Sequence, residues 1–549
     1  MSKTLFRIIA ADHTGITVAN LERSLSFWRD VLGFELSHRP HQTGNLASEI
    51  TGVPGAEISI AVLKGYGHKI ELLEYLAPPD RKHVDLRPCD VGSVHVALTV
   101  DNLHAVMSAI AASGWKAVEK EELRSRMTFS ADEDFALQLD AEDPLRQFRE
   151  KFHLPLGKNG RPVIYFAGNS LGLMPKGARA IVEEEMDNWA KLGVDAHHAT
   201  GTPWYSYHET LREPIAGLVG AKPLEVICMN SLTVNLHLMM VTFYQPTKSR
   251  FKILMEEPAF PSDTYAIKSQ IVHHWLDPKE ALILAQPRKA ELTVRTEDIV
   301  DLIQKHGDQL AVIMIGGVNF FTGQLFNIPE ITAAAQNCGI IVGFDLAHAI
   351  GNVPLALHDW NVDFAVWCSY KYLNASPGAV AGAFVHERHA TNTNLPRLAG
   401  WFGNDPNTRF RLHLEPEFIP VPSADGWQIS NPPIFSMAPL RASLAIFDEA
   451  GGMERLRAKS IKLTGYFEFL LGQAGSNRFT VITPRKRDAR GCQLSILAHE
   501  HPRELFKKLQ AAGVKCDFRE PNVIRAAPTP LYNTFHEVWR FAKILAEHQ

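Results

Sequence analysis

An acid, a histidine and a lysine follow two strand-like apolar runs in the middle of the chain. Asp345 ends the first run and His348 lies three positions later, while Tyr370 and Lys371 follow the second run. A lysine amine can bond covalently to the aldehyde of pyridoxal phosphate (PLP), and an acid can keep the pyridine nitrogen protonated so that the ring accepts electrons. A lone lysine after a strand would more simply lie on the surface. The ordered set favours a PLP site instead.

The segments around these residues alternate between strands and helices. Strands are predicted at residues 251–255, 311–315, 340–344 and 362–368, and a long helix at 178–192. This alternation predicts an α/β fold whose mostly parallel sheet is covered by helices on both faces. Ligands bind such sheets at the carboxyl ends of the strands, which is where Asp345 and Lys371 fall.

The pattern changes again after Pro432-Pro433. A helix is predicted at residues 438–450, and strands at 492–497 and 523–527 belong to a smaller α+β unit. We therefore predict one PLP-type unit at 130–549. Its large domain covers about 160–430, and its small domain combines the N-terminal segment of the unit with about 435–549.

Composition limits the class of protein. The chain has 549 residues with 46% hydrophobic and 21% charged residues, which is typical of a soluble globular protein of more than one domain. The net charge of −4 gives no electrostatic case for nucleic acid or for a membrane surface. The N-terminus lacks the pattern of a secretory signal. The six cysteines are scattered along the chain, and we interpret them as reduced thiols. We expect a cytoplasmic protein with no membrane segment.

The first 120 residues form a separate domain with an internal repeat. A strand at 13–18, a helix at 21–32 and three strand-like segments at 34–38, 57–63 and 68–75 make a βαβββ unit. A second copy restarts with a strand at 93–100 and a helix at 103–112. Its closing strands have no counterpart in the sequence, so we predict that this βαβββ-repeat domain is incomplete.

The front domain resembles the vicinal oxygen chelate superfamily of glyoxalases and dioxygenases. The segments that carry the likeness are HTGITVANLERSLSFWRDVLGFEL and KIELLEY. The resemblance implies that His13, Glu71 and His95 lie at three of four positions that hold a divalent metal in that superfamily. The plainer alternative is two hydrogen-bonded strand histidines and a solvated glutamate, which would leave the domain a purely structural role.

The second part resembles the kynureninase family, which are fold-type I PLP enzymes of the aminotransferase class V group. The matching segments occur in order and include YFAGNSLGL, EEPAFPSD, FFTGQLFNIPEIT, VGFDLAHAIGNVPLALHDW, WCSYKYLN and IRAAPTPLYN. The resemblance implies hydrolysis of the Cβ–Cγ bond of L-kynurenine or 3-hydroxy-L-kynurenine to anthranilate or 3-hydroxyanthranilate plus L-alanine. That reaction belongs to tryptophan catabolism and NAD biosynthesis.

The resemblance also assigns site residues. Lys371 and Tyr370 are the expected catalytic residues. Residues expected to bind PLP are Leu232, Thr233, Phe260, Pro261, Ser262, Asp263, Asp345, His348, Tyr370, Lys371, Trp401 and Asn431. Arg525, Asn431 and His198 are expected to contact the substrate, although His197 is an equal alternative to His198. The family pattern implies that Trp401 and Asn431 come from a partner subunit, and hence a homodimer with shared sites.

Several of these residues have plainer readings when taken alone. Thr233 would be a helix cap, Asp263 a turn residue and Phe260 a core residue. Two other functions also remain open at this stage. One is a desulfurase-like class V lyase, which needs a reactive cysteine on a mobile loop, and the other is a catalytically idle ligand sensor. The absence of a cysteine in a Gly/Ser-rich loop speaks against the first, and the intact Lys371, Asp345 and Arg525 against the second.

Overall fold

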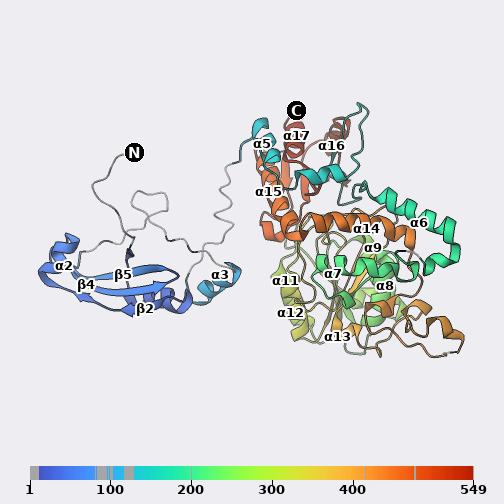
Figure 1. Cartoon of the computed structure of the whole chain (residues 1–549), viewed down its shortest axis with the longest axis horizontal. Helices are drawn as coiled ribbons and strands as arrows, with labels where there is room; N and C mark the ends of the chain where they lie inside the picture. The colour runs from blue at the N-terminus through green and yellow to red at the C-terminus, as the bar shows by residue number, and fades with distance from the viewer. Residues whose placement is uncertain are drawn as a thin grey trace. The chain divides into compact units, whose positions relative to one another are not determined.

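The computed structural model describes residues 12–80, 82, 96, 98, 103–115, 129–199, 201–414, 416–474 and 478–547. The chain forms two compact units, residues 1–127 and 128–549 (Figure 1). None of the helices in the described ranges combines the length and the apolar character needed to cross a membrane.

The described residues of the front unit form a five-stranded mixed sheet. Its strands are β1 (Thr14–Thr17), β2 (Glu35–His38), β3 (His41–Gln42), β4 (Glu57–Gly65) and β5 (His68–Ala77). The strand order is β1-β5-β4-β2, and β1 runs parallel to β5. One βαβββ unit therefore forms as expected.

The described residues of the front unit include three helices. They are α1 (Leu21–Ser26), which continues into a π-helical turn at Phe27–Val31, α2 (Gly44–Thr51) and α3 (Leu103–Ala112). Leu21 and Leu25 of α1 are buried against the sheet, and α3 has the predicted bounds. The helix α2 was not predicted, and the predicted strand at 93–100 lies almost wholly outside the described residues.

The second unit is built on a seven-stranded sheet. Its strands, in spatial order, are β7 (Val226–Cys228), β13 (Gly382–Val385), β12 (Phe364–Trp367), β11 (Ile341–Asp345), β10 (Leu310–Gly316), β8 (Lys252–Glu256) and β9 (Leu282–Ala285). Neighbouring strands are parallel from β12 to β9, and only β13 runs antiparallel to both of its neighbours. The predicted mostly parallel sheet is confirmed.

Helices cover both faces of this sheet (Figure 1). One core contains residues of α7 (Arg212–Val219), α11 (Thr296–His306), α12 (Ile328–Asn337) and α14 (Ile434–Glu449), and the other contains residues of α8 (Leu232–Phe243) and α9 (Pro261–His273). Side chains of β10 alternate between the two cores, since Ile313 belongs to the first and Val312 to the second. All four strands that the sequence predicted in this region form.

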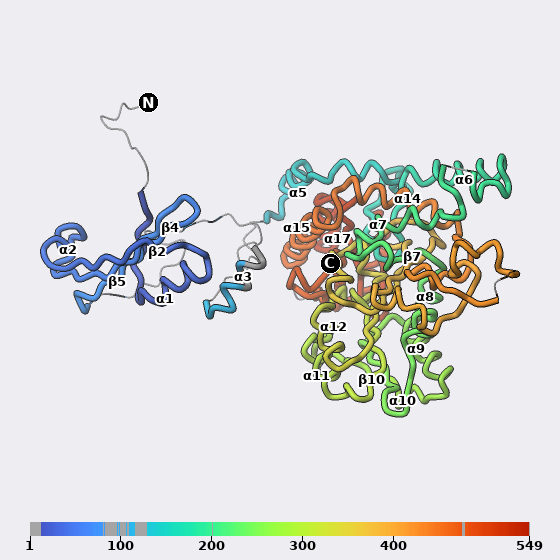
Figure 2. Tube along the Cα trace, turned by 60° about the horizontal axis from the view of Figure 1, so that its bottom comes forward, coloured from blue at the N-terminus to red at the C-terminus, as the bar shows by residue number. Residues whose placement is uncertain are grey.

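The small domain has its own core and an antiparallel sheet. The sheet order is β14 (Phe479–Val481), β15 (Leu494–Ala498), β18 (Val523–Ala526) and β17 (Asp517–Arg519). The helices are α5 (Glu133–Ala141), α15 (Gly452–Gln473), α16 (Pro502–Ala511) and α17 (Phe535–Ala546). Although α5 is far away in sequence, it packs in this core and lies beside α15 in Figures 1 and 2.

The remaining elements are short or peripheral. They are α6 (Ala178–Leu192), α10 (Pro278–Ala281), α13 (Glu387–Ala390) and a two-stranded pair of β6 (Ile164–Tyr165) with β16 (Val514–Lys515). The helix α14 begins four residues before the predicted start at 438. A start there would place Pro439 in the first turn, where proline is tolerated. Packing of Ile434 against the core extends the helix backwards instead.

Candidate active site

The carboxyl ends of the parallel strands bring the predicted chemical residues together. Glu256 ends β8, Gly316 ends β10 and Asp345 ends β11, and Lys371 follows β12. Gly316 and Asp345 are register partners. A small cavity at these ends is lined by Glu256, Phe260, Asp263, Gly316, Val318, Phe320, Asp345, Ala347, His348 and Lys371. The structure therefore brings Asp345, His348 and Lys371 together at this edge of the sheet.

Lys371 is buried beside a neutral histidine. Its side chain is 9% exposed, and Nζ lies 3.2 Å from His348 Nε2 and 5.6 Å from the centroid of the Phe260 ring. Burial lowers the pKa of His348 well below its usual value, and the positive charges of Lys371 and Arg525 lower it further. A neutral His348 can accept a hydrogen bond from the lysine amine.

Two aspartates face each other across the cavity. Asp345 Oδ1 accepts a hydrogen bond from the backbone N–H of Ala347 at 2.7 Å. Asp263, on α9, has a pKa raised well above its usual value, first by burial and then by the charge of Asp345 and a hydrogen bond to it. Burial and the neighbouring negative charge therefore favour the neutral form of Asp263.

The first turns of two helices meet beside this pair. The helix α8 begins at Leu232 and its preceding residue makes no side-chain cap hydrogen bond, while α9 begins at Pro261. Thr233 Oγ1 lies 3.1 Å from Ser262 Oγ. Backbone N–H groups and hydroxyls at a helix N-terminus suit a phosphate group. Thr233 lies inside the first turn of α8, so it is not the cap residue of the plainer reading.

An aromatic ring and a phenol complete the surroundings of Lys371. The Phe260 ring is 37% exposed and meets the Phe320 ring edge-on at 5.3 Å between centroids. Phe260 is therefore not a core residue. Tyr370 is partly buried, and burial raises its pKa above the usual value, followed by the effect of Cys368. Its phenol stays protonated at neutral pH.

Arg525 is buried in the small domain beside the loop at 319–322. Its side chain is 1% exposed and donates from one Nη to the carbonyl of Phe320 at 2.6 Å. The other Nη forms an ion pair with Asp517, the register partner of Arg525 on β17. Its Nε has no hydrogen-bond partner among the described residues. Arg525 is therefore a buried residue and not a surface one.

Several predicted site residues do not line the cavity itself, and four of these lie in other segments, at 197–198, 401 and 431. Trp401 is only partly buried and Asn431 is exposed, and neither lines the cavity around Lys371. His198 stacks loosely with Tyr205 at 5.8 Å, and His197 contacts the ring of Trp204. The described residues of one chain therefore do not bring these four side chains to Lys371.

The predicted metal residues of the front unit are described only in part. His13 Nε2 lies 3.2 Å from Glu71 Oε2. The two residues are adjacent because β1 and β5 are neighbouring strands, with Gly15 opposite Glu71. His95 lies outside the described residues, so the three-residue set stays a prediction.

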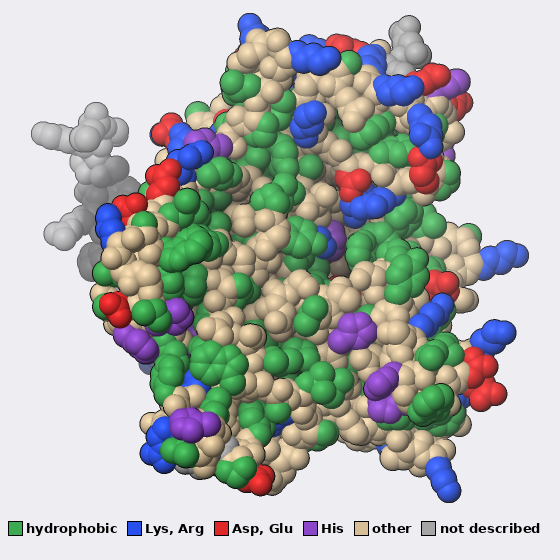
Figure 3. Space-filling view, turned by 90° about the vertical axis from the view of Figure 1, so that its right-hand side faces the viewer, with side chains coloured by type: hydrophobic (Ala, Val, Ile, Leu, Met, Phe, Trp, Pro, Cys, Tyr) green, Lys and Arg blue, Asp and Glu red, His purple; other side chains and the backbone are tan. Residues whose placement is uncertain are grey.

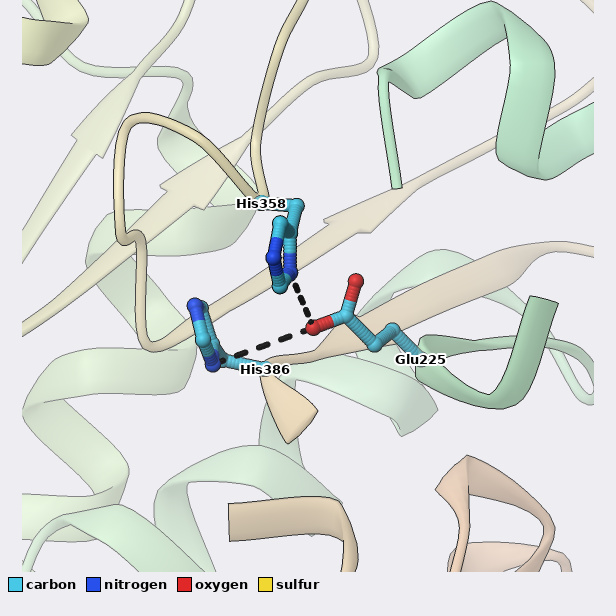
Figure 4. A group of neighbouring side chains, drawn as sticks. All are labelled: Glu225, His358 and His386. Carbon is cyan, nitrogen blue, oxygen red and sulfur yellow. Dashed lines mark hydrogen bonds and ion pairs between the residues drawn. The ribbon is translucent and has the colours of Figure 1, made fainter. Parts of the chain in front are cut away.

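Glu225, His358 and His386 form a second acid–histidine group in the PLP-type unit (Figure 4). Both rings direct Nδ1 at Glu225 Oε1, at 2.9 and 3.7 Å, and the two rings are stacked within 19° of parallel. Glu225 also accepts backbone N–H groups of Lys222 and Glu387. Glu225 Oε1 is already hydrogen-bonded to His358 and to the backbone N–H of Glu387, and Oε2 to that of Lys222. This group is a hydrogen-bonded brace between loops.

Three neighbours of the site were missed by the sequence analysis. Glu256 and Phe320 line the cavity, and Asp517 holds Arg525. Glu256 ends a buried strand with an acid, which is the same signal that singled out Asp345. Asp517 and Phe320 carry no local signal, because their roles depend on strand register and on the packing of the two domains.

The residues present fit PLP. Asp263 Oδ1 and His348 Nδ1 are buried polar atoms with no partner among the described residues. They lie in the same site as the Phe260 ring, the Lys371 amine and the N-termini of α8 and α9. PLP has a planar ring with a cationic nitrogen, a hydroxyl and a phosphate, and each of these groups has a matching partner among the residues present.

Comparison with known proteins extends the description of both units. Residues 456–545 match the model of the kynureninase C-terminal domain, and residues 10–143 match the Glyoxalase/Bleomycin resistance protein/Dioxygenase superfamily. Kynureninase of Myxococcus xanthus is 56% identical over 420 residues, which cover 76% of this chain and 98% of that protein. Kynureninases of Koribacter versatilis and Flavobacterium psychrophilum are 52% and 50% identical, with 97% and 98% of their lengths covered.

Solved structures show the same fold at low identity. The apo cysteine desulfurase of Thermococcus onnurineus aligns with a TM-score of 0.58 at 18% identity, covering 70% of this chain and 94% of that one. A C-DES variant with glycine covalently linked to its PLP cofactor aligns with a TM-score of 0.61 at 15% identity, covering 73% of this chain and 99% of that one. At these identities the likeness concerns the fold alone.

Proposed function

The chain belongs to the kynureninase family, and on that premise we propose that it hydrolyses the Cβ–Cγ bond of L-kynurenine or 3-hydroxy-L-kynurenine. The products are anthranilate or 3-hydroxyanthranilate and L-alanine. The observation that carries the proposal is 56% identity over 98% of the length of a kynureninase. Hydrolysis delivers the water hydroxyl to Cγ, which becomes a carboxylic acid, and a proton to Cβ.

PLP, when bound, supplies an electron sink for the bonds at the substrate Cα. We assign Lys371 as the covalent anchor and, once released, as the base that takes the Cα proton. Asp345 would keep the ring nitrogen charged, with Asp263 beside it, whose pKa is raised by burial. Phe260 would stack on the ring, and the first turns of α8 and α9, with Thr233 and Ser262, would bind the phosphate.

Tyr370 and Arg525 act on the substrate in this proposal. The protonated phenol of Tyr370 can donate a hydrogen bond or pass a proton near the γ-carbonyl, where water must add. The Arg525 guanidinium binds the α-carboxylate, since its Nε is buried without a partner and two parallel hydrogen bonds fit a carboxylate.

The aromatic end of the substrate is assigned to residues that one chain holds away from Lys371. We propose that Trp401 and Asn431 of a second copy reach the site, with His198 or His197 near the substrate ring. A homodimer with shared sites explains why these residues have no role within the cavity of their own chain.

An apolar face beside α6 supports a second copy as the partner. A groove of about 680 Å³ is lined by residues that include Leu154, Met174, Val182 and Met186. Nearby Trp189 is 60% exposed. Figure 3 shows hydrophobic side chains across the middle of this side of the molecule and charged ones toward its rim. Exposed apolar patches of this kind mark protein interfaces.

The dimer is tested by sedimentation velocity. Met186→Glu should shift the protein towards monomers and lower activity, while Leu137→Glu, at a comparably exposed site on α5, should do neither. A fully dimeric Met186→Glu variant would refute the assignment of this face.

The catalytic proposal is tested by incubating the purified chain with PLP and L-kynurenine. Anthranilate and alanine should appear in equal amounts. A desulfurase-like lyase would instead produce sulfane sulfur and alanine from cysteine. Burial raises the pKa of Cys228, Cys368, Cys492 and Cys516, and none of the described cysteines is exposed. A buried protonated thiol is a poor nucleophile, so the described cysteines give this second function no support.

The front unit is a glyoxalase-type domain whose role we propose to be independent of the hydrolase reaction. Its His13–Glu71 pair is a candidate site for a divalent metal if His95 joins it. The cytoplasmic location and a place in tryptophan catabolism and NAD biosynthesis are likewise proposals.

A further inference from the structure

A third carboxyl group lies at the strand ends beside Asp345. Glu256 and Asp345 end strands on either side of β10, and Gly316 ends β10 between them. Glu256 Oε1 accepts the backbone N–H of Gly316 at 3.1 Å. A Cβ atom on Gly316 would come within 2.9 Å of the same oxygen. Because Gly316 has no Cβ atom, it leaves the space that the Glu256 carboxyl group occupies.

Glu256 is isolated from solvent and surrounded by other charges. Its side chain is 4% exposed, and Oε2 has no hydrogen-bond partner among the described residues. The titratable groups that share the cavity are Asp345, Asp263, His348 and Lys371. Burial, followed by the negative charge of Asp345, raises the pKa of Glu256 to about 7, although two backbone hydrogen bonds lower it.

The charges of the neighbouring groups determine whether Glu256 can be ionised. Three ionised carboxylates would face a single lysine amine in a buried space, and neighbouring like charges cannot all ionise there. The raised pKa values of Glu256 and Asp263 favour their neutral forms, which reduces the negative charge in the cavity where the PLP ring would bind.

We propose that Glu256 is a positioning residue for the cofactor: as a neutral carboxylic acid that binds the Gly316 N–H, it fixes the end of β10 beside Asp345, the register partner of Gly316, and adds no negative charge of its own to the cavity. This inference rests on the proposed PLP function of the site. The competing interpretation is that Glu256 only binds the Gly316 N–H and has no influence on the cofactor.

The test compares Glu256→Gln, which keeps the shape and stays neutral, with Glu256→Ala, which removes the carboxyl group. The readouts are the Kd for PLP, the pH midpoint of the visible absorption of the bound cofactor, and the Tm of the cofactor-free protein. Glu225→Gln is the matched control, because Glu225 is also fully buried and binds backbone N–H groups but lies outside the site.

We expect Glu256→Gln to retain PLP affinity within about threefold and to leave the spectral midpoint unchanged. Glu256→Ala should weaken PLP binding about tenfold and move the midpoint. Glu225→Gln should lower only the Tm. The infrared band of a protonated carboxylic acid should be lost in Glu256→Gln, a measurement that does not depend on the alanine variant folding.

Two results would overturn the inference. A spectral midpoint that falls in Glu256→Gln would show that wild-type Glu256 is ionised, since a negative charge would then have been removed. Unchanged PLP affinity in Glu256→Ala with a lowered Tm would show a purely structural role. Failure of the proposed function is distinguishable, because the wild-type chain itself would then bind no PLP or would be labelled at a lysine other than Lys371.

Discussion

Substitution of Arg525 by lysine tests how the substrate α-carboxylate is bound. One Nη of the guanidinium donates to the Phe320 carbonyl and the other pairs with Asp517, whereas Nε has no hydrogen-bond partner among the described residues. A lysine ammonium keeps the positive charge but cannot serve Asp517, Phe320 and two parallel hydrogen bonds to a carboxylate at once.

The expected magnitude follows from the lost contact. One charge-assisted hydrogen bond to the carboxylate contributes roughly 1.5–3 kcal/mol. At about 1.4 kcal/mol for each factor of ten, KM for kynurenine should rise about 10- to 150-fold. L-Alanine and alaninamide can be compared as competitive inhibitors, and only alanine has a carboxylate. The ratio of the inhibition constant of alaninamide to that of L-alanine should therefore fall by a similar factor.

The assay measures kcat and KM by anthranilate release, together with the two inhibition constants. Arg149→Lys is the matched control, because Arg149 also donates to a carbonyl, that of Tyr532, and to a carboxylate, that of Glu537. It should lower the Tm without changing KM. A KM within about twofold of wild type for Arg525→Lys, with the preference for alanine intact, would refute the role of Arg525.

Four further predictions follow from the same structure. Lys371→Ala should abolish turnover with the fold retained, and borohydride should fix the cofactor on the peptide containing Lys371 in the wild type; labelling of another lysine would contradict the site. 3-Hydroxykynurenine should be preferred over kynurenine because Asn431 and His198 can pair with the ring hydroxyl, and an equal or higher kcat/KM for kynurenine would contradict this. Deletion of residues 1–125 should leave an active hydrolase. Metal analysis of the full chain should find little metal, and stoichiometric metal that is lost on His13→Ala would contradict this expectation. Burial lowers the pKa of His208 to about 4. The unfolded chain therefore binds this proton near pH 6.5 while the folded protein does not, so up to about 3 kcal/mol of stability should be lost as pH falls from about 6.5 to 4. Urea unfolding of His208→Gln should show a shallower loss over that range, and an identical one would contradict the prediction.

Local sequence pattern predicted the part of the site that depends on strand ends. Asp345 and Lys371 each follow a buried apolar run, and parallel strands bring such ends to one edge. Glu256 carries the same signal, but the predicted strand stopped one residue early at Met255, so the acid appeared to belong to the following turn.

Other features could not be predicted from local pattern. The pairing of Asp517 with Arg525 depends on the register between two strands that only the folded sheet fixes. The proposed approach of Trp401 to the site of a second copy would depend on a contact between chains, which leaves no periodic trace in the sequence. The helix α2 is short, and its only buried residue is Ala47, so it lacks a strong amphipathic pattern.

The loop residue Phe320 links two binding events that are usually considered separately. Its carbonyl accepts from Arg525, while its ring lies against Phe260. Arg525, the proposed α-carboxylate anchor, and Phe260, the proposed ring-stacking residue, therefore contact the same loop residue. A change that displaces this loop should alter the affinities for amino acid and cofactor together, and binding of either one should tighten the site for the other.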